Sequence, residues 1–380
     1  MKRYIFLVCF MQIVSCAHAS NNTADINDDE IAGSVQSADW KDPSPHSVRF
    51  ITVDKDVRLE VLDWGGTGRS IVLLAGMGAT AHIYDNFAPK LTKDYHVLGI
   101  TRRGFGASSK PASGYDADRL GDDVVAVLDR LRLEKPVLVG SSIAGQELSS
   151  VASRFPDRIS GLIYLDAAYQ YAFDGDGSIE KWIKTRDVEA KIQESGEASA
   201  SSSKEKSAPQ IISMPNPPSP GAADLASISS YLSWAKRVQG FVQPEATMRE
   251  NLIVSHDGKI TGFRALPEES RHAWQAIDQG VKSYKNIPVK CLAIYSDPSS
   301  LKPWEKEAGP EARAQIVKFK SDLSKSFEKI ASSFEKGVPD AHVVRIPGSD
   351  HFVFLSNEKE VLQEMYDFLK SLHFSRNSSL

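Results

Sequence analysis

Two adjacent serines lie where a strand-like run of residues meets a helix-like run. Ser141 and Ser142 follow the apolar run 137–139, and residues 143–154 read as a helix. A nucleophilic serine at such a turn sits on strained backbone, which requires small residues two positions before it and two positions after it. Ser142 has glycine and alanine there, whereas Ser141 has valine and isoleucine. The spacing therefore predicts Ser142 as a nucleophile.

A serine hydroxyl becomes strongly nucleophilic only when a neighbouring base, such as an imidazole, accepts its proton. Among the nine histidines, His351 follows the strand-like run 343–346 through a short loop and precedes the last helix-like run. This places it at the carboxyl end of the last strand, where open α/β sheets build their sites. No such context surrounds the histidines at positions 82, 96, 256, 272 and 342. We therefore predict His351 as the base.

Short apolar runs that alternate with helical periods must position these two residues. The apolar runs bounded by Gly or Pro are 71–75, 96–100, 137–139, 159–165, 289–295 and 343–346. Apolar residues recur at helical spacing over 120–131, 316–334 and 361–372. A hairpin of residues 49–53 and 57–63 precedes them. Strands that alternate with helices predict an α/β fold with a mostly parallel sheet and helices on both faces.

Residues 169–286 interrupt this alternation, so we expect them to form a lid inserted between core segments 47–168 and 287–380. The insertion opens with aromatic residues and then becomes rich in Ser, Glu and Lys. Its Pro-rich stretch 215–220 excludes a helix or a central strand, and we expect a mobile loop over 199–220. Helices are expected over 225–238 and 267–284. The aromatic side chains that could line a pocket are Tyr169, Tyr171, Phe173, Trp234, Phe241 and Trp274.

Three motifs follow one another along the chain: Arg103-Gly104-Phe105-Gly106-Ala107-Ser108, Gly140-Ser141-Ser142-Ile143-Ala144-Gly145 and Gly348-Ser349-Asp350-His351-Phe352. With these motifs, residues 49–372 resemble the α/β-hydrolase superfamily in its serine esterase and lipase-like branch. A nucleotide-binding sheet would instead carry Gly-x-Gly-x-x-Gly after its first strand, and this pattern is missing.

The resemblance implies an oxyanion hole formed by the backbone N–H groups of Met77 and Ile143. It leaves the acid of the triad open. The usual position, after the seventh strand, aligns with Ser299, although Asp297 lies close to it. The other solution in the family places the acid after the sixth strand, where Asp166 stands, and we rank Asp166 before Asp297.

A serine at this position implies hydrolysis of a carboxylic ester, or of a related acyl bond of a small molecule, through an acyl-enzyme on Ser142. Two alternatives stay open at this point. One is a binding or sensing protein of the hydrolase fold whose triad is vestigial, and the other is an acyltransferase or perhydrolase on the same scaffold.

The composition argues against several other partners. No metal and no cofactor are expected, because the histidines are dispersed without ligand spacing. Basic residues are scattered and the net charge is −4, which argues against nucleic-acid binding. The oligomeric state is not indicated.

The first residues have the order of a secretory signal peptide. Lys2 and Arg3 precede the apolar run 4–14, and Ala-His-Ala follows at 17–19. We expect export to the periplasm or the medium with cleavage after Ala19, and a flexible linker over 20–46. An alternative is a lipoprotein box over 13–16 with acylation of Cys16, which would be the only link to a membrane. Beyond this region Cys291 is the single thiol, and we expect it to be buried and inert.

Overall fold

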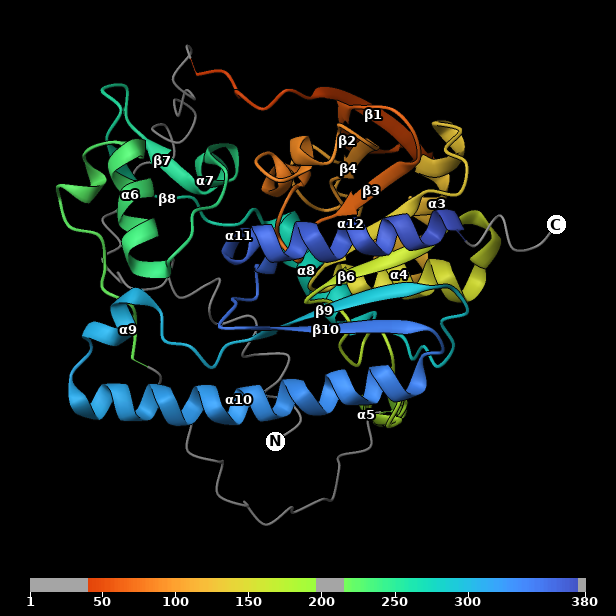
Figure 1. The fold of residues 1–380 in the computed structure, drawn as a ribbon. Coiled ribbons are helices and arrows are strands. Elements are labelled where there is room, and N and C mark those ends of the chain that lie inside the picture. The colour runs from red at the N-terminus through yellow and green to blue at the C-terminus, as the bar shows by residue number, and fades with distance from the viewer. Residues whose placement is uncertain (1–39, 196–214, 375–380) are drawn as a thin grey trace.

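The computed structural model describes residues 40–195 and 215–374, and its centre is one eight-stranded sheet (Figure 1). The strands lie in the order β1 (Ser47–Asp54), β2 (Val57–Gly65), β4 (His96–Ile100), β3 (Ser70–Leu74), β5 (Val137–Ser141), β6 (Gly161–Leu165), β9 (Cys291–Asp297) and β10 (Ala341–Pro347). The pairs β1–β2 and β2–β4 are antiparallel, and every other pair is parallel. The predicted fold class and the predicted hairpin are confirmed.

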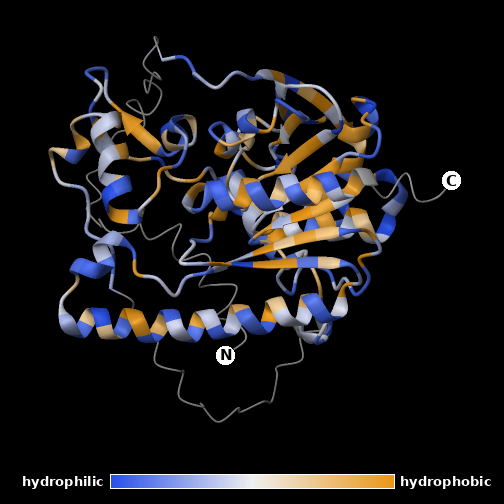
Figure 2. Cartoon of the chain, in the orientation of Figure 1, coloured by the Kyte–Doolittle hydropathy of each residue, from blue (hydrophilic) through white to orange (hydrophobic). Residues whose placement is uncertain are grey.

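Helices cover both faces of this sheet. In β3, Val72 and Leu74 pack in the core cluster that includes α3 (Ala117–Arg130), α4 (Ala144–Arg154) and α10 (Pro310–Gly337). Ile71 and Leu73 alternate with them and face the second cluster. That cluster holds the helices η1 (Ala81–Tyr84), η2 (Ala88–Lys90), α11 (Val353–Ser356) and α12 (Glu358–Phe374). In Figure 2 the strands are mostly hydrophobic, whereas the helices carry both hydrophobic and hydrophilic residues. The strands are hydrophobic because helices bury them on both faces of the sheet.

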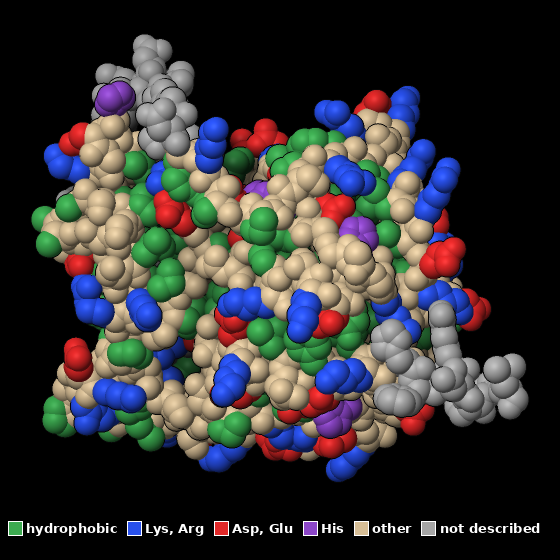
Figure 3. Space-filling model, turned by 45° about the horizontal axis from the view of Figure 1, so that its top comes forward, with side chains coloured by type: hydrophobic (Ala, Val, Ile, Leu, Met, Phe, Trp, Pro, Cys, Tyr) green, Lys and Arg blue, Asp and Glu red, His purple; other side chains and the backbone are tan. Residues whose placement is uncertain are grey.

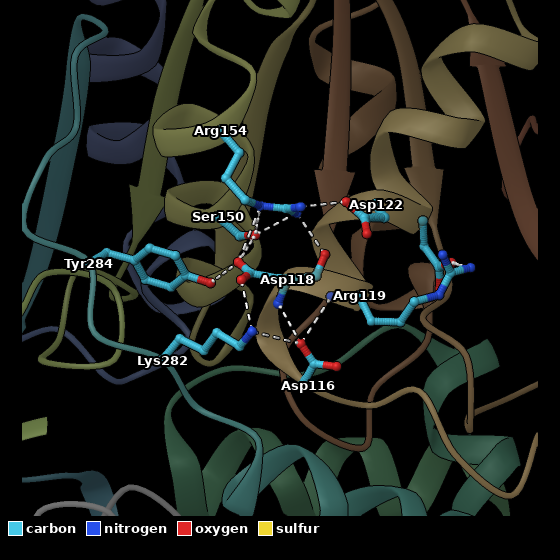
Figure 4. A network of polar contacts seen from close by, with 9 residues as sticks. Asp116, Asp118, Arg119, Asp122, Ser150, Arg154, Lys282 and Tyr284 are labelled. Carbon is cyan, nitrogen blue, oxygen red and sulfur yellow. Dashed lines mark hydrogen bonds and ion pairs between the residues drawn. The ribbon is translucent and has the colours of Figure 1, made fainter. Parts of the chain in front are cut away.

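A polar network centred on Asp118 ties α3 to α4 and to the end of the insertion (Figure 4). Its carboxylate accepts hydrogen bonds from Ser150 at 2.8 Å, Tyr284 at 2.8 Å and Lys282 at 2.9 Å. Arg154 donates to the backbone oxygen of Asp118 at 2.6 Å. Because Ser150 and Arg154 belong to α4, the network fixes the helix that begins beside the predicted nucleophile.

Part of the insertion forms a small core of its own beside the sheet, whereas α5 (Ser178–Ser195) and α8 (Glu268–Gln279) pack against the main core. The other elements of the insertion are η4 (Asp224–Ala226), α6 (Ile228–Gln239), α7 (Glu245–Asn251), β7 (Leu252–Val254) and β8 (Ile260–Phe263). Tyr231 and Trp234 of α6 pack with Leu252 and Ile260 of the β7–β8 hairpin. Helix α8 lies within the predicted range 267–284, and α6 ends one residue beyond the predicted range 225–238. The sequence analysis did not anticipate α5, α7 or the hairpin.

Between β9 and β10 the chain forms α9 (Pro303–Glu307) before the long helix α10, and η3 (Pro156–Arg158) precedes β6. Helix α10 contains the predicted helical face over 316–334.

On the face drawn in Figure 3, basic and acidic side chains are interspersed rather than gathered by sign. Cys291 is buried, and burial raises the pKa of its thiol to about 12, as expected for an inert cysteine.

Several predictions fall on residues outside the described ranges. These are the signal peptide over 1–19, acylation of Cys16, most of the linker and most of the loop over 199–220. Of the expected linker, only residues 40–46 are described, and they contact the core: Trp64 donates a hydrogen bond to Ser44 Oγ at 2.9 Å. At least part of the expected linker therefore packs on the core. No helix in the described ranges is both long and apolar enough to cross a membrane.

The close approach of α4 to the end of β6 leads to a stability prediction. A Cβ added to Gly145 would lie 1.9 Å from the backbone oxygen of Ala167, so Gly145→Ala must displace backbone. We expect the free energy of unfolding to fall by about 1–3 kcal/mol, measured by denaturant titration. Gly262→Ala is the matched control, since its Cβ would meet only Ile253 Cδ1 at 3.5 Å. Equal effects of the two substitutions would contradict the argument.

Candidate active site

Ser142 is the first residue after β5 and lies on the strained turn that its sequence context predicts. Its φ is +54°, in the left-handed region that side chains other than glycine rarely adopt. Its N–H donates to the backbone oxygen of Leu165 in β6 at 3.3 Å, and α4 begins two residues later. A Cβ on Gly76 would lie 3.1 Å from Ser142 Cβ. The loop after β3 therefore packs directly against the predicted nucleophile.

This loop also carries one of the two predicted oxyanion donors. Met77 and Ile143 are buried, and neither N–H donates a hydrogen bond to another group in the described part of the chain. Backbone donors left available beside a nucleophile are what an oxyanion hole requires. Met77 follows Gly76, and Ile143 follows Ser142, so both donors adjoin the contact between these two residues.

A buried ion pair holds the loop in place. Arg102 donates hydrogen bonds to the backbone oxygens of Ala75 at 2.9 Å and Gly76 at 3.2 Å. The same guanidinium forms two hydrogen bonds with Glu147 in the first turn of α4, one of them at 2.9 Å. Arg102 thus connects the oxyanion loop to the helix behind Ser142. Sequence reasoning missed this pair, although a Glu facing the core one turn after the elbow is a signal for a buried partner.

His351 and Asp166 form the strongest contact of the site. His351 Nδ1 lies 2.6 Å from Asp166 Oδ2. Asp166 directly follows β6 with φ +48° and is fully buried. Its carboxylate also accepts from Ser296 N at 2.9 Å and from Ser296 Oγ at 2.8 Å. When Nδ1 donates to the carboxylate, Nε2 is left as the basic nitrogen.

The basic nitrogen of His351 is buried and makes no hydrogen bond among the residues that the structure describes. Burial alone lowers the pKa of His351. The hydrogen bond and negative charge of Asp166, together with the charge of Asp350, outweigh burial and raise this pKa above its ordinary value. An unpartnered imidazole nitrogen with raised basicity suits proton abstraction from an alcohol.

The alternative acid, Asp297, points elsewhere. Its carboxylate accepts from Ser299 N at 3.1 Å, from Ser299 Oγ at 3.0 Å and from Ser324 Oγ of α10 at 2.8 Å. No hydrogen bond links it to His351 within residues 40–195 and 215–374. Asp350 also turns away and pairs with Lys302 at 2.7 Å. The geometry therefore favours Asp166 over Asp297.

Besides Tyr169, whose ring centroid lies 6.5 Å from that of His351, two of the predicted lid aromatics lie near the site. Trp274 of α8 packs so closely on the oxyanion loop that a Cβ on Gly78 would lie 2.6 Å from its ring. The ring centroid of Phe241 lies 6.0 Å from that of Phe352, the residue after His351. The other four pack into cores, namely Tyr169, Tyr171 and Phe173 in the main core and Trp234 in the core of the insertion.

A cavity of about 230 Å³ lies on the His351 side of the site. Phe241, Lys302, Ser296 and His351 are among its lining residues, whereas Ser142 is not. Of the predicted catalytic residues, His351 therefore lines this cavity, and Phe241 of the insertion lines it as well.

Comparison with known proteins agrees with this architecture. Residues 69–208 match the family model described as alpha/beta hydrolase fold. A solved E-2-(acetamidomethylene)succinate hydrolase superposes with a TM-score of 0.52 at 18% identity, covering 86% of this chain and 99% of that one. The chain therefore has the α/β-hydrolase fold, and its residues 69–208 match that family. A thermophilic esterase from Thermogutta terrifontis is similar in fold to this chain, with a TM-score of 0.51, 18% identity and coverage of 86% and 99%.

Similarity in sequence to curated proteins is confined to part of the chain. The AB hydrolase superfamily protein YisY of Bacillus subtilis (strain 168) is 35% identical over 125 residues, which is 31% of this chain and 45% of the relative. The 3-oxoadipate enol-lactonase 2 of Acinetobacter baylyi is 30% identical over 115 residues, or 30% and 43% of the two chains. The chain thus matches less than half the length of these relatives.

The contact between Asp166 and His351 predicts which acid matters. We expect Asp166→Asn to lower the rate of Ser142 acylation about 10³–10⁴-fold, because the amide would no longer orient or stabilise the imidazolium. Asp297→Asn is the matched control and should leave the rate unchanged. The measurement is the second-order rate constant for labelling by a fluorophosphonate, with circular dichroism to verify folding. The reverse ranking would reassign the acid.

The raised pKa of His351 predicts a pH dependence. Only neutral His351 can accept the serine proton, so the acylation rate should rise with pH and reach half its maximum above about pH 6.5, the value of an unperturbed histidine. Asp166 contacts this imidazole, the charge of Asp350 acts on it without a hydrogen bond, and Lys302 is paired with Asp350. A half-maximum below that pH would mean that burial lowers the pKa of His351 more than the two carboxylates raise it.

Proposed function

We propose that the protein is an exported serine hydrolase that cleaves carboxylic esters, or related acyl bonds of small molecules, through an acyl-enzyme on Ser142. The observation that carries the proposal is the 2.6 Å contact of Asp166 with His351, whose other ring nitrogen is buried and unpartnered. The strained elbow at Ser142 and the available N–H groups of Met77 and Ile143 support it.

The chemistry assigns one role to each group. His351 Nε2 accepts the proton of Ser142 as the serine Oγ attacks the acyl carbon. The N–H groups of Met77 and Ile143 bind the oxygen that becomes negative. His351 then returns the proton to the leaving group, whose bond to the acyl carbon breaks. Water, deprotonated by His351, attacks the acyl carbon, and the bond between this carbon and Ser142 Oγ breaks. His351 returns the proton to Oγ, which restores the serine as the acid leaves.

The names of similar proteins support cleavage of an acyl or related bond, but they do not identify the substrate. Among similar proteins, one curated relative is called an enol-lactonase and one solved structure an esterase. The N-terminal order of charged, apolar and small residues supports export. The alternative of a vestigial triad was based on the unusual position of the acid, and Asp166 in contact with His351 weakens that basis.

Covalent labelling tests the enzyme directly. We expect a fluorophosphonate probe to add one label per chain of the purified protein, at Ser142, because the proposed mechanism makes His351 the base that activates this serine. Ser142→Ala should abolish labelling, whereas Ser141→Ala, which removes the neighbouring buried hydroxyl, should retain it. Labelling is read by intact mass and peptide mapping.

A folded protein that shows no Ser142-dependent labelling would contradict the enzyme and favour the binding protein. If labelling occurs, esters of graded acyl length identify the preferred substrate. Product analysis with added alcohols then separates hydrolysis from acyl transfer, since only a transferase forms the new ester in preference to the acid.

A further inference from the structure

Four side chains with metal-binding atoms meet on the far side of the loop that carries Met77. Asp42 and His46 lie just before β1, and His82 and Asp85 lie in and directly after η1. One ligand atom from each residue falls within 4.8 Å of the other three. None of these residues has a role in the proposed hydrolysis, so the cluster needs a separate explanation.

The separations suit coordination of one ion. His82 Nδ1 lies 2.9 Å from Asp85 Oδ2 and 3.3 Å from Asp42 Oδ2, and His46 Nδ1 lies 3.1 Å from Asp85 Oδ1. Ligands about 2.0–2.1 Å from a tetrahedral Zn²⁺ stand about 3.3–3.4 Å apart. The two separations from His82 Nδ1 are therefore near ligand spacing. His46 approaches Asp85 through the other carboxylate oxygen, so side-chain rotations must complete a single set of four ligand atoms.

Hydrogen bonding alone leaves this cluster incomplete. Although His46 Nδ1 and Asp85 Oδ1 are 3.1 Å apart, their orientation makes no hydrogen bond, and both atoms are buried without a hydrogen-bond partner. The side chains of His46 and Asp85 are 6% and 3% exposed. Leaving buried polar atoms unsatisfied costs free energy. A cation between them would satisfy both at once.

The surroundings hold the ligands and leave an entrance. Ser44 N donates to the other oxygen of Asp42 at 2.9 Å, and Ser44 Oγ donates to the backbone oxygen of Asp85 at 3.2 Å. The His46 ring packs edge-on against Trp64. Such outer contacts orient metal ligands. Asp42 and His82 are 21% and 16% exposed, so an ion can reach the cluster from solvent on their side.

We propose that Asp42, His46, His82 and Asp85 bind a divalent transition-metal ion, with Zn²⁺ as the best match to two imidazole nitrogens and two carboxylate oxygens. Four protein ligands fill a tetrahedral shell, so the ion is structural and takes no part in acyl chemistry. It fastens residues 42–46 to the connection between β3 and β4. The chain contributes ligands from two separate segments, which is why their sequence spacing showed no metal pattern.

The experiment uses the full chain prepared without a histidine tag, stripped with a chelator and then titrated with ZnCl₂. We expect one Zn²⁺ per chain by dialysis and elemental analysis, and a higher unfolding temperature with Zn²⁺. His82→Ala and Asp85→Asn should each weaken binding by more than about 100-fold, since loss of a ligand exceeds loss of an outer contact. His96→Ala is the matched control, because His96 pairs with Asp63 at 2.9 Å and neither residue belongs to the cluster.

Replacement by Co²⁺ adds a readout that does not depend on stability. Wild type should show the intense visible absorption of a four-coordinate Co²⁺ site, and His96→Ala should keep it, while the two ligand variants lose it. Circular dichroism reports whether each variant is folded. If wild type binds Zn²⁺ no better than the ligand variants, or if His96→Ala abolishes binding, the cluster is a pair of His–Asp ion pairs and the proposal is wrong.

Discussion

The hydrogen bond between Asp166 and His351 is the contact on which the rest of the site depends. Asp166 is fully buried, and a buried carboxylate is costly unless its oxygens are satisfied. Two donors from Ser296 and the imidazole N–H supply this compensation. Because these groups come from the ends of β6 and β9 and from the loop after β10, the contact exists only when all three strands lie side by side. The sheet order provides that arrangement.

Backbone strain at the same edge of the sheet follows a common pattern. Ser142 and Asp166 directly follow the neighbouring strands β5 and β6, and both adopt positive φ. Each turn aims a polar side chain beyond the carboxyl end of its strand instead of into the apolar layers. The strain is sustained because Gly145 lets α4 approach Ala167 closely and the Asp118 network fixes α4 from its other end. Rigid packing thus sustains the strained backbone of the site.

The sequence predicted what depends on local pattern. Runs of apolar residues located the strands of the main sheet, and small residues around Ser142 distinguished it from Ser141. Pattern could not separate Asp166 from Asp297, since both end a strand and only the fold decides which one meets His351. Helix α5 was missed because its many charged residues leave no clear apolar stripe. The Arg102–Glu147 pair and the Asp42–Asp85 cluster join segments far apart in sequence, and local periodicity carries no information on such contacts.

The connection between β3 and β4 links the two parts of the molecule that the proposals concern. It begins with Gly76 and Met77 beside Ser142 and continues into η1, which carries His82. Tyr84 donates to the backbone oxygen of Leu74 at 2.9 Å, so the connection folds back onto its own strand. An oxyanion hole stabilises charge only if its donors are already in place when the charge develops. Arg102 restrains this connection at its beginning, and an ion bound by His82 and Asp85 would restrain its middle. The two devices would thus limit movement of the segment that carries the Met77 donor.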